Sequence, residues 1–265
     1  MSTKLWRTLT IALGGFWLLD GVLQFQPAMF TNMFVSMVLA PNLVGQPGII
    51  ASIISFGIRI WSTNLFWFNF VAALIQVVIG ALLILPLWTR ARDGAVRFGL
   101  WLSVFWALVI WIFGEGFGNL FTGSASFYTG APGSALLYAI IALFILDAMN
   151  ENNDAPLQKL PGTVGVLFLV GAVLNLAPMF WQSGIMSNLA AVAILACLGI
   201  FLILTPNRPV AWVIIVFLVV VWWLGQSFGG LGTFPGGTAT DPNSAPFLVL
   251  FLLPIFFMPT PQSSS

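Results

Sequence analysis

Apolar residues along this chain occur in long runs rather than in the short alternating patterns of soluble folds. A transmembrane helix needs about 20 predominantly apolar residues. The run at 47–61 is interrupted by Gly57 and Arg59, so we expect an interfacial or re-entrant helix there. The longer runs predict an all-α, polytopic transmembrane helix bundle of about eight spans. The predicted spans cover residues 8–26, 65–88, 98–115, 134–149, 163–182, 188–205, 209–227 and 245–259.

Composition agrees with a protein whose main partner is the lipid bilayer. Hydrophobic residues make up 60% of the 265 residues and charged residues only 6%, whereas soluble domains carry about 25% charged residues. The net charge of +1 gives no reason to expect a nucleic-acid partner. The chain has no histidine and one cysteine, Cys197. We therefore expect no disulfide within the chain and no haem or metal bound by it, and redox chemistry would need a flavin, a quinone or another subunit.

The positive charges predict the orientation of the bundle. Cytoplasmic loops of membrane proteins carry an excess of Lys and Arg. With eight spans, Arg59 falls on one side, and we predict that the other side is the cytoplasm of a bacterial cytoplasmic (inner) membrane, holding both termini. A seven-span alternative would place the C-terminus outside. The charges assigned to the cytoplasm are Lys4, Arg7, Arg90, Arg92, Arg97, Lys159 and Arg208.

The chain also resembles itself. Residues 97–135 align without gaps on 208–246. In that alignment the motif WIFGEGFGNL (111–120) lies on WWLGQSFGGL (222–231). Upstream, GVLQFQPAMF (21–30) matches GAVLNLAPMF (171–180), and the second copy lacks most of the segment that follows Phe30. We predict two tandem four-helix halves, 1–150 and 151–265, related by a pseudo-twofold axis along the membrane normal.

Ionisable side chains inside a bilayer are costly, so each one marks a possible site. Asp20 and Glu115 are the acids that lie within, or at the outer end of, a predicted span. Gln24 lies one helical turn above Asp20, and Gln226 occupies the position of Glu115 in the second half. We predict a ligand-binding site near the outer mouth, formed by Asp20, Gln24, Glu115 and Gln226.

Each acid also has a structural interpretation. Glu115 lies between two glycines and could face water where its helix stops. Asp20 could be held by a structural partner on a neighbouring helix, such as Gln76. Loops 114–133 and 225–244 contain six glycines each, and we expect them outside the membrane, where they could fold back into the bundle.

Four sequence motifs resemble those of known proteins: FWLLDGVLQFQPAMF (16–30), GQP (45–47), GEGFGNLFTG (114–123) and TGAPGSALLYA (129–139). They resemble a family of largely uncharacterised bacterial polytopic membrane proteins, found notably among actinobacteria. More distantly, the unit around NFVAALIQVVIGALLILPLWTRAR (69–92) is similar to the DoxX/DoxD group. That resemblance implies an association with thiosulfate:quinone oxidoreduction, or with membrane redox or stress complexes.

These expectations give a leading hypothesis and two alternatives. The leading one is an integral membrane subunit whose outward-facing polar pocket binds a small molecule, either quinone-like or a small reduced substrate. It would be accessory to a membrane redox or respiratory assembly, with other membrane subunits as partners. The first alternative is a transporter or channel for a small solute, with Asp20 and Glu115 on its path. The second is a structural membrane subunit without a ligand. No residue can be assigned a catalytic role.

Overall fold

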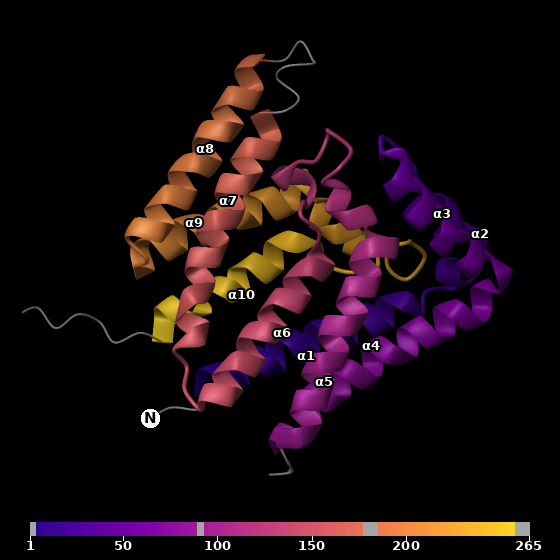
Figure 1. Cartoon of the computed structure of the whole chain (residues 1–265), viewed down its shortest axis with the longest axis horizontal. Coiled ribbons are helices and arrows are strands. Elements are labelled where there is room, and N and C mark those ends of the chain that lie inside the picture. The colour runs from indigo at the N-terminus through magenta and orange to yellow at the C-terminus, as the bar shows by residue number, and fades with distance from the viewer. Residues whose placement is uncertain (1–3, 89–92, 177–184, 258–265) are drawn as a thin grey trace, which may run out of the picture.

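The computed structural model of the chain describes residues 4–88, 93–176 and 185–257. Within those ranges the chain is helical and contains no strand, which confirms the all-α prediction (Figure 1). The helices are α1 (Lys4–Gln24), α2 (Asn32–Phe34), α3 (Gly48–Thr63), α4 (Leu65–Trp88), α5 (Asp93–Val109), α6 (Ser134–Glu151), α7 (Leu160–Leu176), α8 (Ile185–Leu204), α9 (Arg208–Val220) and α10 (Ser244–Phe257).

Five helical segments of the described ranges are long and apolar enough to cross a membrane, so the chain is a helical membrane protein. The other predicted spans coincide with α1, α8 and α10, and the number of helices that cross stays a prediction. Residues 47–61 form most of α3, a shorter apolar helix. Arg90, Arg92 and the ends of predicted spans 163–182 and 245–259 lie outside the described residues. The five segments are Leu65–Leu85, Asp93–Gly114, Ser134–Glu151, Pro156–Leu176 and Arg208–Gly225.

Close helix pairs organise the bundle. Helix α1 packs along α4, and α7 packs along α8 in the same manner (Figure 1). Glycines allow both contacts: a Cβ on Gly80 would lie 2.7 Å from the carbonyl oxygen of Gly14, and one on Gly199 would lie 2.8 Å from that of Gly165. Small residues at helix interfaces let backbones approach closely in lipid, where apolar surface alone gives little attraction between helices.

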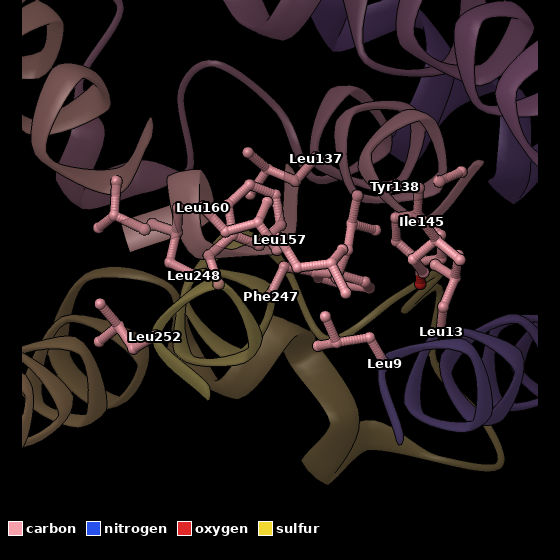
Figure 2. Close-up of a cluster of buried hydrophobic side chains, with 14 of the residues drawn as sticks. Leu9, Leu13, Leu137, Tyr138, Ile145, Leu157, Leu160, Phe247, Leu248 and Leu252 are labelled. Atoms are coloured by element: carbon pink, nitrogen blue, oxygen red, sulfur yellow. The ribbon is translucent and has the colours of Figure 1, made fainter. Parts of the chain in front are cut away.

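Helices α6 and α10 contact each other in the centre of the bundle, and both also pack against α1 (Figure 1). Helix α6 packs in addition along α5, and α10 packs against α7 and α9. Figure 2 shows the apolar side chains that converge there from α1, α6 and α10. Tyr138 of α6 belongs to this cluster, and its ring centroid lies 4.0 Å from that of Phe247 and 4.5 Å from that of Trp17. This packing directs the Tyr138 hydroxyl to Asp20 on α1.

A segment of about one-seventh of the chain separates α1 from α4 and carries α2 and α3. It has a small core of its own, formed by Met29, Phe34 and Leu39. The Phe34 ring lies 5.5 Å from the ring of Trp61, which joins the two ends of the segment. In Figure 1 this segment lies on the flank of the molecule opposite α7 and α8.

Candidate functional site

Glu115 caps a helix that begins 19 residues later in the chain. Helix α5 ends in a π-helical turn over Ile110–Gly114, after which the backbone leaves the helix. The Glu115 carboxylate accepts a hydrogen bond from the Ser134 hydroxyl at 2.5 Å and from the Ala135 N–H at 3.1 Å. A carboxylate at a helix N-terminus satisfies N–H groups that have no partner within the helix, and it is favoured by the helix dipole.

Gln226 makes the corresponding cap in the second half, using an uncharged amide. It follows a π-helical turn over Val221–Gly225. Its Oε1 accepts from the Ala245 N–H at 3.1 Å, and its Nε2 donates to the Ser244 hydroxyl at 2.9 Å. The amide therefore satisfies the first turn of α10 as the carboxylate satisfies that of α6, and capping by itself does not require the charge of Glu115.

The indoles above the two caps also correspond. Trp111 Nε1 donates to the carbonyl oxygen of Pro132 at 2.8 Å, and Trp222 Nε1 donates to that of Pro242 at 2.6 Å. Each indole packs edge-on against a phenylalanine with positive φ, Phe117 or Phe228. The two segments that match in sequence thus have the same local structure.

Asp20 is buried near the end of α1, with 4% of its surface exposed. The Tyr138 hydroxyl donates to its Oδ2, whereas Oδ1 has no hydrogen-bond partner. One turn later, the Gln24 amide donates to Asn69 Oδ1, and Asn69 Nδ2 donates back to the Gln24 carbonyl oxygen at 2.9 Å. Gln24 is therefore tied to α4, whereas Asp20 retains an unused acceptor.

A cavity of about 100 Å³ lies between α1, α3, α4, α5 and α6, and Asp20, Gln24 and Glu115 all line it. Gln226, predicted for the same site, is not among the lining residues and lies at the cap of α10. The structure thus brings three of the four predicted residues together. Six further residues of the lining matter to its chemistry: Trp17, Trp61, Gln76, Trp106, Tyr138 and Asp241.

A larger, polar recess of about 590 Å³ adjoins this cavity, and we call it the vestibule. Glu115, Ser134 and Asp241 line both spaces. The rest of the vestibule wall comes mainly from loop 114–133, with contributions from residues 37–44 and loop 225–244. Asn, Ser, Thr and Gly residues predominate in it, so a polar recess borders the cavity on this side.

Each glycine-rich loop reaches across to the other half of the chain. In loop 114–133, the Ser126 hydroxyl donates to Asn175 Oδ1 of α7 at 3.1 Å. In loop 225–244, the Ala239 carbonyl oxygen accepts from Gln26 Nε2, just beyond α1, at 2.9 Å. This crossing brings Asp241 from the second half to a cavity built by the first.

Sequence reasoning missed Tyr138, Asp241 and the indoles as parts of this site. Tyr138 is one of two tyrosines in the chain and lies in an apolar run, which was an available signal. No sequence pattern pointed to Asp241, because its place in the cavity wall depends on how loop 225–244 packs against the first half of the chain. The packing of α3 decides the position of Trp61 in the same way.

The completed lining is rich in acceptors and aromatic rings. It includes the carboxyl groups of Asp20, Glu115 and Asp241, and none of the lysines and arginines in the described ranges lines it. Such a surface can hold a solute that donates hydrogen bonds. No protein-family profile, no curated protein and no solved structure matches this chain.

Proposed function

We propose that this chain is an integral membrane protein that binds a small polar solute in the cavity between Asp20 and Glu115. The observation that carries this proposal is the Asp20 carboxylate, whose Oδ1 is buried beside a cavity without a hydrogen-bond partner. Buried polar groups in native proteins nearly always have partners, and exceptions concentrate where a ligand or an ion completes the set. The vestibule supplies a path for such a solute.

The direction of entry follows from the charges. Arg97 and Arg208 lie at the ends of α5 and α9 opposite the vestibule, where they donate to the carbonyl oxygens of Met149 and Phe256. The positive-inside rule assigns that end to the cytoplasm. The vestibule then opens outward, as expected for a protein of a bacterial cytoplasmic membrane with both termini inside.

Two halves of common origin account for the paired features of the fold. A pseudo-twofold axis requires that a contact from the first half to the second has a counterpart in the reverse direction. The two loops meet this requirement, since each bonds to the other half near the outer end of α1 or α7. Matched caps, matched indole contacts and matched glycine pairs further support duplication of a four-helix unit.

Transport of the solute is a second candidate, favoured by this arrangement of halves. Several transporters consist of parallel repeats that move against each other around a central site. We expect a transporter to move its solute into proteoliposomes at a rate that falls with Glu115→Gln. A binding subunit would bind the solute without flux.

The redox role remains a hypothesis that rests on the resemblance to DoxX/DoxD proteins. The cavity, at about 100 Å³, is smaller than the ~150 Å³ cavity known to accept benzene. A quinone ring therefore fits it poorly, and a smaller solute is favoured. Purification in mild detergent followed by mass spectrometry of lipophilic molecules and partner proteins would test the redox role directly.

A cavity-filling variant tests the proposal. Val109 lines the cavity, whereas its neighbour Leu108 is 38% exposed on the outside of the bundle. A solute that binds only the native state raises the melting temperature of the purified protein. In a panel of small charged and neutral solutes, we expect the stabilising members to lose their effect on Val109→Phe but not on Leu108→Phe. Unchanged stabilisation of Val109→Phe would place binding elsewhere and refute the proposal.

A further inference from the structure

The carboxyl groups of the cavity have no lysine or arginine beside them among the described lining residues. They belong to Asp20, Glu115 and Asp241, which all line the cavity. Arg97 and Arg208, the cations at the inner ends of α5 and α9, are engaged far from it at the ends of α6 and α10. A carboxylate buried in a membrane protein is costly unless it is paired. A cationic occupant would pair with these groups in their ionised form.

The unused acceptors define the kind of cation. Asp20 Oδ1 and Gln76 Oε1 have no hydrogen-bond partner, and the two side chains are 4% and 5% exposed. Both residues line the cavity, from α1 and α4. An ammonium group with several N–H bonds can donate to two acceptors at once. A metal ion is less suited, because the described residues contain no group of three His, Cys, Asp or Glu side chains placed to hold one.

The aromatic part of the lining suits the same ion and adds a second requirement. Trp17, Trp61, Trp106 and Tyr138 line the cavity, and the faces of such rings attract ammonium groups. The Nε1 atoms of Trp61 and Trp106 are buried donors without partners. They need an acceptor, which an ammonium group does not provide but a hydroxyl oxygen on the same molecule does.

The volume limits the size of the occupant. A cavity of about 100 Å³ is below the ~150 Å³ that accommodates benzene. Only a few non-hydrogen atoms fit. An ion with long substituents, or with several rings, would have to widen the bundle.

We infer that the occupant is a small primary ammonium ion whose short body carries a hydroxyl, with ethanolamine as the simplest example. This inference rests on the proposed function, because it names the solute that the cavity would bind. The ammonium group meets Asp20 and Gln76, and the hydroxyl meets the indole N–H groups. The same chemistry could come from a free amino alcohol or from the ethanolamine headgroup of a phospholipid.

Equilibrium dialysis of radiolabelled ethanolamine against the purified full chain, in detergent free of aminophospholipid, tests the inference. Three competing solutes test the functional groups of ethanolamine one by one. Ethylammonium lacks the hydroxyl, tetramethylammonium lacks N–H donors, and ethylene glycol lacks the charge. We expect saturable binding, with ethylammonium competing several-fold less well than ethanolamine. Tetramethylammonium and ethylene glycol should each compete at least tenfold less well.

Glu115→Gln is the informative variant, because Gln226 shows that an amide can make the same helix cap. We expect it to weaken ethanolamine binding at least tenfold while the protein elutes as a single folded species. Asp154→Asn, which removes an acid from the connection between α6 and α7 outside the cavity lining, should leave the affinity unchanged. Asp20→Asn, which changes the carboxyl group that meets the ammonium group, should weaken binding at least as much. Equal affinity in wild type and in both variants would overturn the assignment of the cation to this cavity.

The outcomes separate this inference from the proposed function. Equal competition by ethylene glycol, or binding of another panel solute without ethanolamine, would overturn the ammonium assignment but leave solute binding in the cavity intact. If filling the cavity with Val109→Phe affects no ligand, both fail. Nanodiscs distinguish the sources: ethanolamine binding that falls when phosphatidylethanolamine replaces phosphatidylcholine supports the lipid headgroup. Binding that is equal in both lipids supports a free amine.

Discussion

The ends of the two halves that carry the glycine-rich loops are built alike, yet only one of them borders the cavity. Glu115 and Gln226 each follow a π-helical turn and cap the next long helix through the same kinds of group. The neutral member makes its cap without a charge. The cap therefore does not require the charge of Glu115. Glu115 also lines the cavity, and this distinguishes the first half from the second.

What surrounds the caps explains the difference. Between α1 and α4 the chain inserts the segment with α2 and α3, whereas only residues 177–184 connect α7 to α8. Phe34, Leu39 and Trp61 of the inserted segment line the cavity and close one side of it. The comparison shows that the segment with α2 and α3 accompanies a cavity beside the first cap, while the caps themselves are built alike.

The largest effect should come from the tight turns that follow the two caps. Gly118 and Gly229 have φ values of +61° and +65°, and a Cβ would lie 1.9 Å from the Pro132 oxygen in the first case and 2.6 Å from the Asp241 oxygen in the second. Since the obstacles are backbone atoms, we expect Gly118→Ala to destabilise the fold by more than about 3 kcal/mol, and Gly229→Ala by somewhat less.

Gly123→Ala is the matched control for backbone strain. Its φ is +72°, but a Cβ there would meet nothing within 4 Å. We expect a cost of about 1 kcal/mol, from the left-handed conformation alone. Unfolding of the three variants by denaturant in detergent micelles would measure the series. A Gly118→Ala protein no less stable than Gly123→Ala would contradict the close approach.

The caps should rank next. Glu115→Ala and Gln226→Ala each leave first-turn groups of a helix unsatisfied, so each should cost about 1–2 kcal/mol of stability. Glu115→Gln should retain most of it, because Gln226 makes the equivalent bonds. The same unfolding measurement applies. If Glu115→Gln were as unstable as Glu115→Ala, the two ends would not be equivalent.

The indole contacts should show a smaller and equal effect in both halves. Trp111→Phe and Trp222→Phe remove the hydrogen bonds to Pro132 and Pro242, at about 1 kcal/mol each. Trp101, 58% exposed on the outside of the bundle, provides the control, and Trp101→Phe should change stability little. Unequal losses at Trp111 and Trp222, measured by thermal unfolding, would show that one half depends on its loop more than the other.

The smallest effect concerns the connection between the halves. Burial raises the pKa of Asp154 above its ordinary value, although backbone hydrogen bonds from Trp6 and Leu5 lower it. The folded state therefore holds this proton to higher pH than the unfolded chain, whose carboxyl titrates near 3.9. The resulting stability is present below that pH and is lost as pH rises through the folded pKa. Asp154→Asn should flatten this part of the melting-temperature profile, and an unchanged slope would exclude Asp154 as its source.

The sequence by itself determined the helical class and the positions of the long helices. Runs such as 65–88 and 134–149 predict α4 and α6 closely, because the preference for lipid over water is set residue by residue along a run. The same local logic singled out Asp20 and Glu115, since an acid in or beside an apolar run is conspicuous. The likeness of 97–135 to 208–246 placed Glu115 and Gln226 at equivalent positions, but it did not predict the helix caps that both residues make.

The tertiary structure alone decided which of these groups meet. Asp20 and Tyr138 are 118 residues apart, and Asp241 reaches the cavity through a loop of the other half. Gln226, equivalent to Glu115 in sequence, does not line the cavity, because the segment with α2 and α3 closes the cavity beside Glu115. The local pattern of apolar residues determines which segments form helices that prefer lipid to water. Contacts between segments distant in the chain depend instead on how the helices and loops pack against one another.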